Sequence, residues 1–119
     1  MRPGPAAPLP LEPDIMARWG IHHDAARGML SLAPRPVPGE ARATCPPFRA
    51  GRTVVALELR QRPGATVLRI AVRFGPAIRV EVTLPGPPGS PAATVDEVPM
   101  AGPRVAFEAR GTHEVAWMA

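Results

Sequence analysis

Apolar and polar positions alternate regularly along residues 52–84. Every second position is apolar in three successive runs, which begin at Val55, Leu68 and Ile78, and charged or small side chains fill the positions between. A period of two is typical of β-strands that have one face on a core and the other in solvent. The pattern therefore predicts an antiparallel meander of three strands with one buried face.

The connections between the runs indicate how the strands pair. Pro63-Gly64 suits the centre of a type II turn, which places Leu59 opposite Leu68. A three-residue loop at 75–77 would pair the second run with the third and would leave Phe74 on the core side. The expected pairs of this second hairpin are Phe74 with Ile78, Val72 with Val80 and Ile70 with Val82. A slip of one residue would turn either strand inside out, so pattern and turns support one register.

A last hairpin is expected over residues 104–118. A three-residue loop at 110–112 would place Phe107 opposite Val115, and Val105 opposite Trp117. The sheet then has apolar side chains that something else must cover.

A helical period occurs near the N-terminus. Residues 13–30 carry apolar or amphipathic side chains at spacings of three and four, which is one face of a helix: Ile15, Trp19, His22, Ala26 and Met29. Pro13 suits the first turn of a helix. Gly20 interrupts the run, so two short helices separated near Gly20 are an alternative. The stripe would cover part of the sheet, and the C-terminal hairpin or a partner chain would cover the rest.

Proline divides the chain into segments. The 119 residues include 18 prolines and 11 glycines, and the prolines gather in blocks that interrupt regular structure. Residues 1–12 are expected to form an extended, Pro-rich arm, and residues 13–119 a single domain. The expected order within the domain is a helix over 13–30, a Pro-rich linker over 31–51, the meander over 52–84, a Pro-rich loop over 85–103, in which 93–98 is a candidate short strand, and the hairpin over 104–118.

These elements define the expected fold class. The fold is mainly β: a small antiparallel sheet, sandwich or barrel of five to six strands, with one N-terminal helix and a Pro-rich N-terminal arm. Hydrophobic residues make up 45% of the chain, but aromatic residues only 4%. Such a thin aromatic content favours a partner chain that completes the core.

The excess positive charge lies on the meander. All 14 basic residues are arginine, against 10 acidic residues and a net charge of +4; GC-rich coding explains the missing lysine, and selection for bidentate anion contacts is the alternative. Four arginines should project from the face opposite the core and form a candidate anion-binding face: Arg60, Arg69, Arg73 and Arg79. The alternative is a solvated face whose charges oppose aggregation. Because Phe74 is expected on the core side, this face has no aromatic residue, which favours contacts to phosphates over base stacking.

No residue pattern indicates catalysis. His22 and His23 are adjacent on the expected helix and point about 100° apart, which is unsuitable for one metal ion. Cys45 is expected in a loop without a helix N-terminus that would lower its pKa. Asp96 and Glu97 would face opposite ways in an extended segment. We therefore expect no enzyme activity and no catalytic, metal-binding or cofactor-binding residues, and no cofactor.

Two hypotheses of function follow. The first is a non-enzymatic structural or adaptor subunit of a larger assembly, such as a virus particle or another multi-subunit machine, which binds through its arm and sheet to protein partners or to further copies of itself. The second is a nucleic-acid-binding or anion-binding module that uses the arginine face. The chain shows no apolar run of membrane-spanning length and no secretory signal at its start. The expected location is therefore the cytoplasm or a particle assembled inside the cell.

Overall fold

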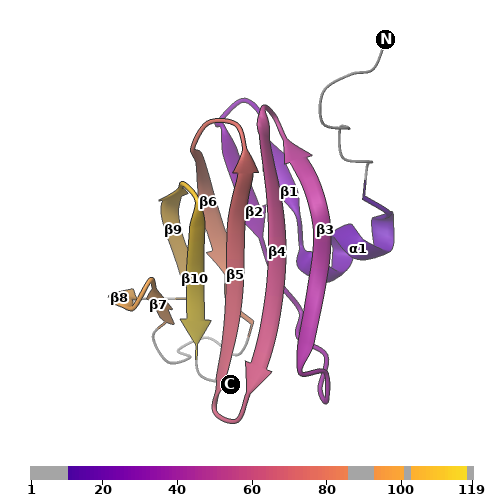
Figure 1. The fold of residues 1–119 in the computed structure, drawn as a ribbon, viewed down its shortest axis with the longest axis vertical. Helices are drawn as coiled ribbons and strands as arrows, with labels where there is room; N and C mark the ends of the chain where they lie inside the picture. The colour runs from indigo at the N-terminus through magenta and orange to yellow at the C-terminus, as the bar shows by residue number, and fades with distance from the viewer. Residues whose placement is uncertain (1–10, 86–92, 101–102, 118–119) are drawn as a thin grey trace.

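Two β-sheets pack face to face around one core (Figure 1). The computed structural model describes residues 11–85, 93–100 and 103–117. Within these ranges lie α1 (Pro13–Trp19), β1 (His22–Asp24), β2 (Met29–Leu32), β3 (Arg42–Ala50), β4 (Thr53–Arg62), β5 (Ala65–Phe74), β6 (Ile78–Thr83), β7 (Ala93–Val95), β8 (Val98–Met100), β9 (Arg104–Ala109) and β10 (Thr112–Trp117). The expected mainly-β fold with an N-terminal helix is confirmed, and it contains more strands than the alternating runs indicated. Of the expected arm, residues 1–10 lie outside the described ranges.

The larger sheet has six strands in the order β3-β4-β5-β10-β7-β8. Its first expected hairpin is confirmed: β4 and β5 are antiparallel, with Leu59 opposite Leu68 and Gln61 opposite Thr66. Gly64 has a φ of 81°, which a type II turn requires at its third residue and which glycine adopts without a steric penalty. Turn chemistry and alternation were therefore sufficient to fix this register.

The second expected hairpin is wrong. β6 does not pair with β5 but belongs to the smaller sheet, whose order is β1-β2-β6-β9. The connection at 75–77 crosses from one sheet to the other (Figure 1). It packs against the turn before β4: a Cβ at Gly75 would lie 2.1 Å from the carbonyl oxygen of Arg52, and Thr53 Oγ1 donates a 2.8 Å hydrogen bond to the carbonyl of Pro76. The expected pairing of Val72 with Val80 therefore does not occur.

The C-terminal hairpin is wrong for the same reason. β9 pairs with β6 in the smaller sheet, with Phe107 opposite Val80. β10 pairs with β5 in the larger sheet, with Val115 opposite Leu68. The short connection after Ala109 thus also crosses between the sheets, and each crossing keeps the apolar residues on the inside.

The smaller sheet covers the apolar face of the larger one. β2 and β6 are its central strands and run parallel, with Leu30 beside Val80. Leu30 and Val80 are fully buried, as are Leu68 and Ile70 of the facing sheet. A layer from the same chain therefore provides most of the cover that was expected from a helix or a partner.

The expected helix over 13–30 ends early. α1 stops at Trp19 because Gly20 has a φ of 60°, and the N–H of Ile21 bonds to the carbonyl of Met16 at 3.0 Å. This arrangement is a Schellman motif, which terminates a helix. A side chain at Gly20 would also collide with Ala33 at 2.6 Å. The helical spacing beyond this point is coincidental, because these residues form the β1–β2 hairpin.

The expected linker over 31–51 contains a long strand. β3 pairs with β4 along the edge of the larger sheet, and its ladder shifts register between Cys45 and Phe48. Pro46 and Pro47 occupy this bulge. Proline lacks the N–H that a ladder requires, so an edge strand with a bulge is the position that tolerates it. Cys45 consequently lies in a strand and not in a loop.

The expected loop over 85–103 contains a hairpin. β7 and β8 are joined by Asp96 and Glu97, whose φ values are 49° and 71°. Two successive positive φ values define a type I′ turn, which matches the twist of a two-residue hairpin. No helix in the described ranges is long and apolar enough to cross a membrane.

Candidate anion-binding face

The face of the six-stranded sheet that points away from the core, here called the outer face, carries most of the charged strand residues. Alternation along β3, β4, β5 and β10 places six arginines on it, with two glutamates: Arg42, Arg49, Arg60, Arg62, Arg69, Arg73, Glu58 and Glu114. Strands of a sheet are about 4.8 Å apart, so the side chains form one continuous patch.

The structure brings together three of the four arginines predicted from the sequence. Arg60, Arg69 and Arg73 lie on the outer face, on β4 and β5. Arg79 lies on β6 in the other sheet, opposite Glu108. Since Arg79 projects from the opposite side of the sandwich, it does not belong to the patch.

Arg42, Arg49 and Arg62 also belong to the patch, although they were not expected there. Arg62 is the last residue of β4. The other two lie on β3, where Arg42 is opposite Arg60 and Arg49 is opposite Val54. The signal was present, because polar and apolar residues alternate on both sides of the bulge. Pro46 and Pro47 concealed it, since two adjacent prolines are typical of a linker.

Three arginines of the patch form ion pairs within the sheet. Arg42 Nη2 lies 2.5 Å from one carboxylate oxygen of Glu58, and Arg60 Nε lies 2.9 Å from the other. Arg69 and Glu114 pair at 2.9 Å between β5 and β10. These contacts fix the directions of the arginine side chains on the sheet surface.

Glu58 is the most enclosed charge of the outer face, with 14% of its side chain exposed. Burial alone would raise the pKa of this carboxyl, but the hydrogen bond and charge of Arg42 and the charge of Arg60 outweigh it, so its pKa is lowered. Its second oxygen, Oε1, contacts Arg60 without a well-directed hydrogen bond. Glu58 is therefore an ionised carboxylate that holds Arg42 and Arg60 on either side of it.

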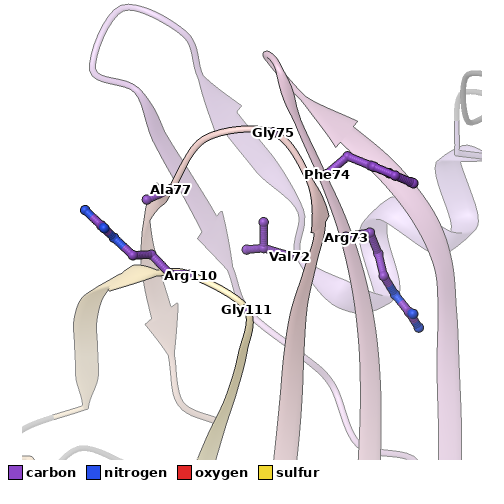
Figure 2. Close-up of a pocket in the computed structure, with 7 residues that line it drawn as sticks. All are labelled: Val72, Arg73, Phe74, Gly75, Ala77, Arg110 and Gly111. Atoms are coloured by element: carbon purple, nitrogen blue, oxygen red, sulfur yellow. The ribbon is translucent and has the colours of Figure 1, made fainter.

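Arg73 and Phe74 share the outer face because of a bulge. The ladder between β4 and β5 shifts register between Val54 and Val55, so that Phe74 lies opposite Val54 while Val72 lies opposite Val55. The shift takes Phe74 out of the core, and the ring is 60% exposed. Figure 2 shows Arg73 and Phe74 extending to the same side of β5, away from Val72. The expectation that Phe74 faces the core is therefore wrong, and so is the inference that the arginine face has no aromatic residue.

Two hollows meet at Arg73. One, of about 360 Å³, lies on the outer face between Arg69, Arg73 and Arg42, with Pro46 on its wall. Ala56 and Ala71 also line it, and these small side chains leave room between the arginines. The other hollow, of about 460 Å³, lies at the end of the sheet and is lined by Phe74, Arg73 and Arg110 (Figure 2).

His113 is the one candidate general base with a carboxylate beside it in the described part of the chain. Its Nδ1 lies 2.6 Å from Asp96 Oδ2, and its Nε2 accepts a 2.8 Å hydrogen bond from the N–H of Arg110. In this geometry Nδ1 is positioned to donate to Asp96. Both ring nitrogens are already engaged, so this arrangement links two turns and offers no nitrogen to a substrate.

The remaining chemical candidates do not assemble into a site. Burial raises the pKa of the Cys45 thiol to about 11, so the nucleophilic thiolate is scarce at neutral pH. His22 and His23 are consecutive on β1, and consecutive strand residues point to opposite faces. Among the described residues, no group of three or more potential ligands could hold a metal ion.

Comparison with known protein families, curated proteins and solved structures finds no match.

Proposed function

We propose that this protein is a non-enzymatic binding module whose outer face binds a polyanion. The observation that carries the proposal is the gathering of six arginines and two glutamates on one sheet face. Guanidinium groups bind phosphate and carboxylate bidentately. A continuous patch of them raises the local concentration of an anionic partner.

Arg49 and Arg73 are the arginines most open to a ligand. Neither forms an ion pair with another described residue, whereas Arg42, Arg60 and Arg69 are paired with Glu58 or Glu114. Arg62 is also without an ion pair among the described residues, but it lies at the opposite end of β4, beside the turn to β5. Arg49 and Arg73 are both exposed, and both lie at the same end of the patch, near Val54 and Phe74 in the ladder. An incoming anion therefore displaces only water at these two positions.

The arginines that form ion pairs can also contribute to anion binding. Arg69 and Glu114 are each more than two fifths exposed, and an exposed ion pair contributes only about 0–1 kcal/mol to stability. Arg69 is thus held in place at little cost and can add a contact to an anion in the hollow beside it. Positioning before binding reduces the entropy lost on binding.

The test is a fluorescence-polarisation titration of a labelled mixed-sequence single-stranded oligonucleotide at about 50 mM and about 200 mM salt. We expect affinity to fall with salt, with a log–log slope near −0.7 for each phosphate contact on a single strand. Arg49→Ala and Arg73→Ala should each reduce the steepness of that slope by roughly one contact. Neither should change the thermal midpoint, because both side chains are exposed.

Arg79→Ala is the matched control. It removes the same charge from the opposite sheet, so the slope should stay as in the unmodified protein. Absence of binding at low salt would end the proposal. Equal losses for Arg79→Ala and Arg73→Ala would also contradict it, because net charge and not the outer face would then drive binding.

We propose, as a second candidate function, a structural or adaptor subunit of a larger assembly, because one sheet edge is open to pairing. Of the four edge strands in the described ranges, β3 and β8 contain proline and β1 has three residues. β9 has six residues without proline. A partner strand can pair with such an edge, which natural proteins usually block.

The partner that fits this edge is a second copy of β9. In an antiparallel pair with its two-fold axis at Ala106, Arg104 of each copy faces Glu108 of the other. Light scattering after size exclusion should then show a dimer. Arg104→Glu should dissociate it, and Arg104→Glu combined with Glu108→Arg should restore it. A monomer at all concentrations would exclude this candidate.

A further inference from the structure

We infer that the polyanion is a single-stranded nucleic acid and that Phe74 stacks on one of its bases. The inference rests on the proposed function, since it names the ligand class of the same outer face. It depends on the position, exposure and neighbours of one aromatic ring.

The bulge in β5 creates this position. Without it, alternation from Leu68 and Ile70 would carry Phe74 into the core. With it, Phe74 leaves the core and 60% of its surface is exposed. Burying a phenylalanine side chain stabilises a folded protein, and the fold forgoes much of that stabilisation here.

Phe74 lies in one row of the outer face with Val54 and Arg49. Val54, opposite Phe74 in the ladder, is only 7% exposed although it lies on the outer face with Arg49. Arg49 and Phe74 flank Val54 in that row, one on each neighbouring strand. Because Phe74 is 60% exposed, much of its side chain is available for contact with a base.

Charge around the ring is suited to a phosphodiester strand. Arg73 precedes Phe74 and extends to the same side of β5 (Figure 2). Arg49 lies in the same row across β4, and Arg110 lines the hollow beside the ring. Proteins that bind single strands combine a basic groove with aromatic side chains on which bases stack. In a duplex the bases are already stacked on each other, so the ring has no exposed base face to contact.

The experiment compares two labelled probes of equal length: a mixed-sequence single-stranded oligonucleotide and an abasic oligomer with the same phosphates. Base–aromatic stacking corresponds to a loss of roughly 5- to 150-fold in affinity when the aromatic side chain is removed. Phe74→Ala should show such a loss with the oligonucleotide and no change with the abasic oligomer. Phe74→Leu keeps an apolar side chain opposite Val54 and should show the same loss, which separates stacking from folding.

Two further variants sharpen the result. Val98→Ala is the control, because Val98 is similarly exposed, at 58%, but lies on the far edge strand of the sheet. The affinity of this variant for the oligonucleotide should equal that of the unmodified protein. Phe74→Trp should retain binding, and its indole fluorescence should be quenched by the oligonucleotide but not by the abasic oligomer. The natural tryptophans, Trp19 and Trp117, are 3% and 6% exposed and contribute little to that quenching.

The possible outcomes distinguish the inference from the proposed function. Equal binding of both probes, with no effect of Phe74→Leu, would overturn the inference and leave the polyanion-binding face intact. Tighter binding of poly-glutamate than of the oligonucleotide would also overturn it, in favour of an acidic protein partner. Binding of neither probe nor poly-glutamate would remove both.

Discussion

Asp96, in the turn between β7 and β8, contacts His113 near the start of β10, 17 residues further along the chain. The Asp96 carboxylate accepts hydrogen bonds from His113 Nδ1 at 2.6 Å and from the backbone N–H of Glu114 at 2.9 Å. His113 in turn accepts one from the N–H of Arg110. The β7–β8 hairpin, which has only three residues in each strand, is thereby attached to β10 by side chains as well as by its ladder.

Acid should weaken this attachment. Burial alone would raise the pKa of Asp96, but the N–H of Glu114 and the contact with His113 outweigh it, so its pKa is lowered from the ordinary value of 3.8. A lowered folded-state pKa gives stability that is present above pH 3.8 and is lost as the pH falls through the lower folded value. Urea unfolding at a series of pH values should show that Asp96→Asn loses less stability than the unmodified protein over that range. Parallel pH profiles would contradict the prediction.

Glu97→Gly should stabilise the protein. Glu97 has a φ of 71° at the second position of a type I′ turn, where glycine is preferred. A left-handed conformation costs a non-glycine residue about 1–2 kcal/mol. Part of that gain is offset because glycine is more flexible in the unfolded chain. The net rise in the free energy of unfolding should be about 1 kcal/mol, measured by urea titration; a decrease would show that the Glu97 side chain has a stabilising role.

Gly75→Ala and Gly64→Ala form a matched pair. Both positions have positive φ, 93° and 81°, so both variants are strained. A Cβ at Gly64 meets nothing within 4 Å, whereas one at Gly75 lies 2.1 Å from the carbonyl oxygen of Arg52. Gly64→Ala should cost about 1–2 kcal/mol and Gly75→Ala a further 1–3 kcal/mol, roughly the cost of overpacking. Equal midpoints in thermal unfolding would show that the crossing at 75–77 is loosely packed.

Ile70→Ala should cost about 2–5 kcal/mol, because it removes buried methylene groups and leaves a cavity. Ile70 is fully buried between the sheets. Val67→Ala, on the outer face of the same strand, should cost far less. Similar costs in urea titrations of the two variants would mean that the register of β5 is wrong.

Alternation predicted the strands better than it predicted their partners. Pro63-Gly64 fixed the β4–β5 register because a tight turn leaves no choice of neighbour. The segment 75–77 is compatible with a hairpin and with a crossing between sheets, since both keep Val72 and Val80 on apolar faces. What favours the crossing is the close approach of Gly75 to Arg52. That approach is a tertiary contact, so it could not be read from the alternation of residues.

Only part of the candidate face could be predicted, because alternation places a residue on a face but does not identify the neighbouring strand. Arg60 and Arg69 follow from simple alternation along two paired strands. Arg79 was assigned to the same face only through the mistaken hairpin. Phe74 was misplaced because a bulge changes the phase of a strand by one residue, and nothing in the local sequence marks where that shift occurs.

The parallel pairing of β2 with β6 has a consequence for how the chain folds. It joins Met29 to Arg79, and the next strand of that sheet, β9, begins only at Arg104. Closing such long loops costs more entropy than forming adjacent hairpins, so contacts of this kind form late and slow the reaction. A chain still emerging from the ribosome can pair β3, β4 and β5. The apolar face of these strands stays exposed until β6 and β9 have been synthesised and the smaller sheet has formed. We therefore expect truncation before residue 103 to give an aggregating fragment and not a smaller stable domain.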